Sequence, residues 1–119
     1  MPNWQLSASD AYERAHRYYE KKHPRELQAV LNNLDRYLIA LNAGAKPQFI
    51  VAGYIHPEPK GVKALDQHGK GNGNLAETRL YVFPQEGECL LHLITIGDKR
   101  SQPADLDLAN SFVSRLKGE

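Results

Sequence analysis

The stretch that decides the fold is ETRLYVFPQEGECLLHLITI, residues 77–96. It holds two segments of β type, residues 77–83 and 89–96, separated by a short polar segment with a glycine, which is the pattern of a β-hairpin. The second segment is apolar on both faces, as a central strand covered on each side would be. The stretch therefore predicts the middle of a sheet, and the rest of the chain must supply its neighbours and its cover.

Two amphipathic helices precede this hairpin in the sequence. Apolar residues recur at helical spacing over residues 11–22, and leucines recur at intervals of three and four over residues 25–43. Pro24 suits the first turn of the second helix, and Gly44 suits the position just past its end. Residues 4–43 therefore predict a brief strand followed by an αα-hairpin.

The remaining segments complete an α+β domain. Residues 48–52 and 62–65 have the composition of short strands, whereas residues 54–61 carry two prolines and predict a loop or an edge segment. Leu108 and the apolar residues after it recur at helical spacing, so a last helix is expected over residues 103–116. We predict one domain over residues 1–119 in the order β-α-α-β-β-β-α, with a small antiparallel sheet of about four strands and the helices on one face.

Composition excludes several classes of protein. The chain has 119 residues, 41% of them hydrophobic and 24% charged, with 15 Lys and Arg against 14 Asp and Glu. This balance argues against non-specific binding to polyanions. Cys89 is the single cysteine, which excludes an intramolecular disulfide and a cysteine-rich zinc site. No export signal and no apolar run of about 18 residues is present, so we expect a cytoplasmic protein without a membrane partner.

The hairpin and its exit resemble a known family. The residues that carry the likeness are Thr78-Arg79-Leu80-Tyr81 and the run from Leu91 to Gln102, an apolar strand that ends in Gly97-Asp98-Lys99-Arg100 before the last helix. Together with the order of elements, they are similar to the RelE/ParE-like toxin superfamily of bacterial toxin–antitoxin modules. The stretch from Lys99 to Ala109 is similar to the addiction-module killer subgroup.

The resemblance implies a RelE-like fold and a ribosome-dependent endoribonuclease that cuts mRNA and inhibits translation. In that family the mRNA 2′-hydroxyl attacks the neighbouring phosphate, so no metal and no cofactor is implied. The implied partners are a cognate antitoxin, the ribosome and mRNA. By position, Arg79 and Lys99 match the cations on the phosphate. We expect Arg100 and Lys63 to assist them, and a histidine or lysine from residues 56–70 is the candidate base.

Other side chains are candidates for RNA contact or proton transfer. Lys60, Lys70 and Tyr81 are candidates for RNA binding, and His56, His68 and His92 for the acid or base. Simpler interpretations stay open: His92 in an apolar strand is a core residue with one satisfied nitrogen, and Arg79 is a strand arginine paired with Glu77.

Departures from the family pattern keep other functions open. The strand lysines of the family would fall near Val62 and Ala64, Lys63 is turned to the other face of its strand, and the tyrosine of the final segment falls near Asp105. The alternative is a catalytically silent protein of the same fold that acts by binding a protein partner. A third interpretation is a gyrase-inhibiting toxin. The sequence leaves open whether catalysis is retained and whether the chain forms a homodimer.

Overall fold

The fold is an α+β arrangement of three helices and a five-stranded mixed sheet. The computed structural model describes residues 3–68 and 75–119. In chain order the elements are β1 (Gln5–Ala8), α1 (Asp10–Lys22), α2 (Pro24–Asn42), the 3-10 turn η1 (Pro47–Phe49), β2 (Ile55–Pro57), η2 (Pro59–Gly61), β3 (Lys63–Asp66), β4 (Thr78–Gln85), η3 (Glu86–Glu88), β5 (Leu90–Asp98) and α3 (Gln102–Leu116).

The strands lie in the order β1-β5-β4-β3-β2. Every pair is antiparallel except β1 and β5, which run parallel with Gln5 opposite Leu90. The predicted antiparallel sheet of about four strands is therefore wrong in its count and in this pairing. The first strand lies far from β5 in the sequence, so no tight turn dictates their relative direction.

The segment that differs most from the sequence prediction lies between α2 and β2. Residues 48–52 form no strand: Pro47 begins the turn η1, and Phe49 and Val51 are exposed. The segment with two prolines instead supplies the edge strand β2, where Pro57 leaves no interior backbone donor missing. The expected edge segment is thus present.

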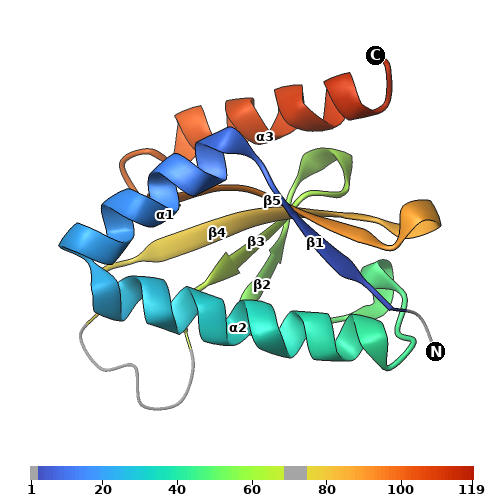
Figure 1. Cartoon of the computed structure of the whole chain (residues 1–119), viewed down its shortest axis with the longest axis horizontal. Coiled ribbons are helices and arrows are strands. Elements are labelled where there is room, and N and C mark those ends of the chain that lie inside the picture. The colour runs from blue at the N-terminus through green and yellow to red at the C-terminus, as the bar shows by residue number, and fades with distance from the viewer. Residues whose placement is uncertain (1–2, 69–74) are drawn as a thin grey trace.

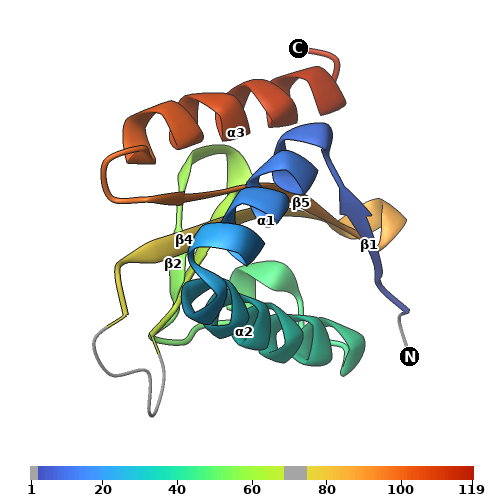
Figure 2. The same cartoon turned by 60° about the vertical axis from the view of Figure 1, so that its left-hand side comes forward.

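Helices cover both faces of the sheet. Figure 1 shows α3 above the strands, α2 below them, and α1 crossing in front from near α3 down to the start of α2; Figure 2 shows the same elements after rotation. One core cluster joins α1 and α2 to residues such as Leu80 and Leu93, and a second joins α3 to residues such as Tyr81 and Ile94. The prediction that all helices lie on one face is wrong, because β5 is apolar on both faces and each face is buried.

Local sequence explains where the helices begin and end. The Ser9 hydroxyl accepts a hydrogen bond from Tyr12 N–H at 3.0 Å and caps α1. Pro24 occupies the first turn of α2, where its missing N–H has no helical partner to lose. Gly44 has a φ of +100° just after α2, a conformation that glycine adopts without strain.

A bulge in β5 ties the sheet to α1. Tyr81 pairs with Thr95 and Val82 pairs with Leu93, so Ile94 is the extra residue. The Ile94 carbonyl accepts a hydrogen bond from the Ser9 hydroxyl at 2.7 Å. Ser9 thus caps α1 and also anchors it to β5.

None of the helices in the described ranges is both long enough and apolar enough to span a bilayer.

Candidate active site

Three side chains form a row across β2, β3 and β4 on the face of the sheet that carries α3. Arg79 lies opposite Asp66 in the register of β4 and β3, and His56 on β2 lies opposite Ala64, diagonally from Asp66. Ala64 and Tyr81 pack in the core cluster beneath α3, which identifies the face. We call His56, Asp66 and Arg79 the polar row.

Asp66 is the centre of the polar row. Its side chain is 2% exposed, and its Oδ2 lies 2.5 Å from His56 Nε2. An ionised carboxylate can only accept hydrogen bonds, so Nε2 of His56 is the donor in this pair, and in the neutral imidazole the lone pair lies on Nδ1. The His56 side chain is 39% exposed, which leaves the ring accessible. This arrangement orients an imidazole that can accept a proton from a bound molecule.

His68, two residues after the end of β3, also contacts the Asp66 carboxylate. His68 N–H donates to Asp66 Oδ1 at 2.9 Å, and His68 Nε2 lies 3.8 Å from Oδ2. Asn33 of α2 donates its amide to the carbonyls of Asp66 and His68 at 2.8 and 2.7 Å. The Gln67 side-chain oxygen accepts from Thr78 N–H at 2.9 Å. Two buried amides therefore position the chain that carries His68.

Arg79 is a largely buried cation with loose partners. Its side chain is 18% exposed, Nη2 lies 3.5 Å from Glu77 Oε1, and Nη1 lies 3.9 Å from Glu58 Oε2. Both distances exceed that of a normal N–H···O hydrogen bond, and Nε has no hydrogen-bond partner among the described residues. A buried donor without a partner costs about 1–3 kcal/mol. The predicted pairing with Glu77 is present, and it leaves donors of the guanidinium free.

Tyr81 lies beneath Arg79 on the same strand face. It is fully buried, and in residues 3–68 and 75–119 its hydroxyl makes no hydrogen bond of normal geometry, although the Arg79 side chain is close enough to interact with it. Burial raises the pKa of Tyr81 to about 12; the carboxylates of Asp105 and Glu58 act in the same direction, and Arg79 opposes them. The phenol is therefore neutral, and in this conformation it has no exposed surface for the RNA contact predicted from the sequence.

The other predicted cations do not join the polar row. Lys63 was expected to assist Arg79, but it pairs with Val82, which packs against the α1 and α2 side, so Lys63 lies on the opposite face of the sheet from Arg79. Lys99 and Arg100 are exposed in the turn between β5 and α3, at the end of the sheet where Arg79 enters β4. Lys60 lies 3.5 Å from a Glu119 carboxylate oxygen.

Two predicted site residues remain, His92 and Lys70. His92 is 6% exposed, its Nε2 lies 2.9 Å from Gln85 Oε1, and its ring packs against Phe83 and Phe112. Burial lowers the pKa of His92. Its environment is that of a core histidine with one satisfied nitrogen. Lys70 lies outside the described residues.

Asp66, Asn33 and Glu58 were not recognised from the sequence as parts of a site. A signal existed for Asp66, since it is a carboxylate at the end of an apolar strand and two residues before a histidine. Asn33 and Glu58 carried no signal, because their role comes from contacts with residues distant in sequence. No group of three histidine, cysteine or acidic side chains in the described part of the chain is arranged to hold a metal ion.

Comparison of this chain with family models, with curated proteins and with solved structures finds no match.

Proposed function

We propose that this protein cleaves RNA by activating the 2′-hydroxyl, as the mRNA-cutting toxin of a toxin–antitoxin module. The observation that carries the proposal is the Arg79 guanidinium, whose Nη atoms are held only by long ion pairs, on the same face of the sheet as an imidazole oriented by a buried carboxylate. Arginine binds a phosphate through two parallel hydrogen bonds, which the two Nη groups of Arg79 can supply.

The distances support contact of one nucleotide with both groups. Arg79 Nη1 lies 3.9 Å from Glu58, which directly follows β2, so the guanidinium reaches across β3 towards the strand that carries His56. Neighbouring strands are about 4.8 Å apart. A scissile phosphate held by Arg79 would therefore place its ribose near His56.

Each residue then has one role in the proposed reaction. His56 Nδ1 takes the proton of the 2′-hydroxyl while the 2′-oxygen bonds to phosphorus. Arg79 stabilises the charge on the non-bridging oxygens. The bond from phosphorus to the 5′-oxygen breaks, and protonated His68 gives a proton to that oxygen. The products are a 2′,3′-cyclic phosphate and a 5′-hydroxyl, and Asp66 is a positioning residue for His56.

The toxin role and its partners rest on the resemblance of the β4–β5 hairpin and its basic exit. Lys99 and Arg100 are exposed at the end of the sheet near Arg79, where they can contact the RNA backbone. A cognate antitoxin and the ribosome are the proposed partners.

One observation favours the alternative of a binding protein without catalysis. Glu58 and Glu77 flank Arg79, and Asp66 adds a third carboxylate, so the site is acidic whenever its histidines are neutral. A phosphate must displace these carboxylates from the guanidinium. If the carboxylates keep the Arg79 guanidinium, no phosphate binds there and the polar row only stabilises the sheet.

Induced production of the chain in bacteria without an antitoxin separates the two proposals. We expect the native chain to stop protein synthesis, Arg79→Ala to leave it unaffected, and Arg17→Ala, which removes an exposed arginine of α1, to act as the native chain does. Continued growth with the folded native chain would favour the binding protein.

A further inference from the structure

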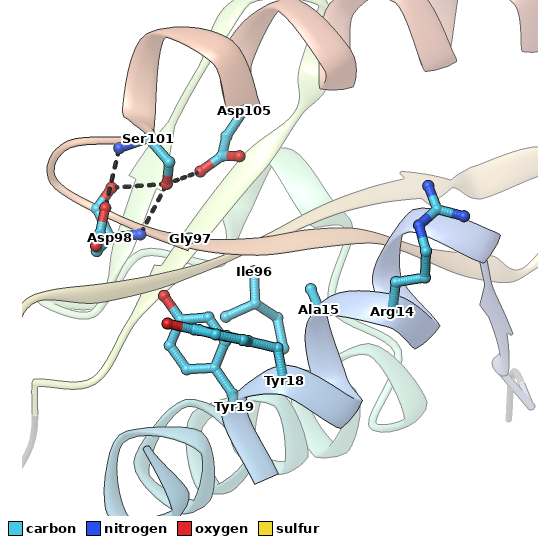
Figure 3. Close-up of a pocket in the computed structure, with 9 residues that line it drawn as sticks. All are labelled: Arg14, Ala15, Tyr18, Tyr19, Ile96, Gly97, Asp98, Ser101 and Asp105. Carbon is cyan, nitrogen blue, oxygen red and sulfur yellow. Dashed lines mark hydrogen bonds between the residues drawn. The ribbon is translucent and has the colours of Figure 1, made fainter. Parts of the chain in front are cut away.

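A polar cavity at the end of β5 shares none of its lining residues with the polar row. Its volume is about 390 Å³, and α1, the end of β5 and the start of α3 form its walls. Figure 3 shows the side chains that matter for its chemistry: Tyr18, Tyr19, Asp98, Ser101, Asp105 and Arg14.

Two carboxylates line this cavity without an ion-pair partner among the described residues. Asp105 Oδ2 accepts a hydrogen bond from the Ser101 hydroxyl at 2.7 Å, and Asp98 Oδ1 accepts one from Ser101 N–H at 2.9 Å. Burial, together with the charge of Asp98, raises the pKa of Asp105, and the Ser101 hydroxyl opposes this rise. The backbone N–H of Ser101 is the main cause that lowers the pKa of Asp98, and Arg100 adds to it. The cavity therefore holds a partly buried acid that no cation neutralises at close range.

The adjacent tyrosine points independently to a ligand. Tyr19 is only 7% exposed, lines the cavity, and makes no hydrogen bond to the other residues drawn in Figure 3. Burial raises the pKa of Tyr19 to about 12, and the charges of Asp98 and Asp105 contribute to the rise. Its hydroxyl is thus a neutral, unpaired polar group directed at the same space as the two carboxylates.

We propose that this cavity binds the guanidinium of an arginine side chain carried by a protein partner. A planar guanidinium with five donors can pair with Asp105 and Asp98 and donate to the Tyr19 hydroxyl. The Tyr18 ring is 54% exposed at the rim and offers a face for the same cation. Figure 3 shows Arg14 at the end of the cavity away from Asp98. Its positive charge disfavours the binding of a second cation at that end. The proposal is independent of RNA cleavage.

Titration of the full chain with capped amino acids, followed by amide NMR, tests it. The probes are N-acetyl-arginine amide and its neutral isostere N-acetyl-citrulline amide. We expect saturable shifts of the Gly97 and Ser101 amides with the arginine probe, and an affinity at least about tenfold lower for citrulline because charge assistance roughly doubles a hydrogen bond's strength. Equal affinities, or no shifts at these amides, would overturn the proposal.

Variants of the cavity residues test where the arginine binds, and free arginine tests whether the natural ligand is part of a protein. Asp105→Asn should weaken arginine binding at least about tenfold, since the charged partner is lost, while Asp107→Asn on the exposed side of α3 should not change it. Tyr19→Phe, which removes only the hydroxyl, should also weaken binding if the spectrum shows an intact fold. Unchanged binding in both cavity variants would refute the site. Free arginine carries an α-carboxylate that the cavity repels, so tighter binding of free than of capped arginine would refute a protein source.

Discussion

Gly97 is the residue whose substitution the structure predicts most sharply. A Cβ at this position would overlap Asp105 Oδ2 and the Ser101 hydroxyl and would lie 2.8 Å from Asp105 Cγ. The backbone of Gly97 is not among the glycines with positive φ, so alanine meets no backbone strain there. Any destabilisation of Gly97→Ala therefore reports the close packing of the first turn of α3 on β5.

The magnitude follows from the hydrogen bonds that the methyl group would break. The bond from Ser101 to the Asp105 carboxylate involves a charged group and contributes about 1.5–3 kcal/mol, and the bond from Asp98 N–H to the Ser101 hydroxyl about 0.5–1.5 kcal/mol. Alanine also lowers the conformational entropy of the unfolded chain relative to glycine, which offsets about 0.4–1 kcal/mol of this loss. We expect a net loss of about 1–4 kcal/mol in the free energy of unfolding, or roughly 4–16 °C in Tm for a domain near this size.

Urea and thermal unfolding followed by circular dichroism measure this loss. Gly87→Ala and Gly53→Ala are the matched controls, because a Cβ at either position meets open space, and we expect them within about 0.5 kcal/mol of the native chain. The double variant Gly97→Ala/Asp105→Ala also removes the carboxylate that the new methyl group would overlap. Its loss in the free energy of unfolding should be smaller than the sum of the losses in the two single variants, since the two sites are in contact. A Gly97→Ala chain as stable as the controls would refute the described packing of α3.

Three further predictions concern the polar row and the core. Asp66→Asn should slow RNA cleavage about 10²–10⁴-fold through loss of proton transfer and shift the His56 ring nitrogens in ¹⁵N NMR; an unchanged rate with an unchanged ring spectrum would deny Asp66 its positioning role. Because the pKa of His92 is lowered in the folded chain, the unfolded chain binds more protons below the ordinary value of about 6.5. The free energy of unfolding should therefore fall as the pH drops through that region, and urea titrations of His92→Gln should show a flatter profile; parallel profiles would contradict the buried, neutral ring. Leu80→Ala, at a fully buried position, should cost about 2–5 kcal/mol in the same unfolding assay, and a loss below 1 kcal/mol would be inconsistent with a core position.

Local patterns predicted the elements, while their arrangement in space needed long-range information. Helical spacing, Pro24 and Gly44 placed α1 and α2 within a residue or two of the observed bounds, because caps and apolar periods act within one turn. The parallel pairing of β1 and the position of α3 were missed, since the first depends on which edge strand β1 joins and in which direction, and the second on which face of the sheet α3 covers.

The candidate site was predicted in the same uneven way. The resemblance singled out Arg79, and Lys63 was expected to assist it, yet the pairing of β3 with β4 places Lys63 on the opposite face of the sheet from Arg79. The base was expected to be a histidine or a lysine in residues 56–70, but nothing local showed that Asp66 would orient His56. That carboxylate acquires its role only when β2 and β3 pair and Asn33 fixes the exit of β3.

The central claim is that the polar row cleaves RNA through the 2′-hydroxyl, and one substrate comparison tests it directly. The purified chain is incubated with ribosomes carrying an mRNA whose cleaved nucleotide is either ribose or 2′-deoxyribose, beside Arg79→Ala and Arg17→Ala. The account predicts cleavage of the ribose substrate to a 2′,3′-cyclic phosphate and a 5′-hydroxyl, none of the deoxy substrate, a loss of at least about 100-fold in Arg79→Ala, as for removal of a charge-stabilising donor, and native activity in Arg17→Ala. Cleavage of the deoxy substrate, or native activity in Arg79→Ala, would contradict it.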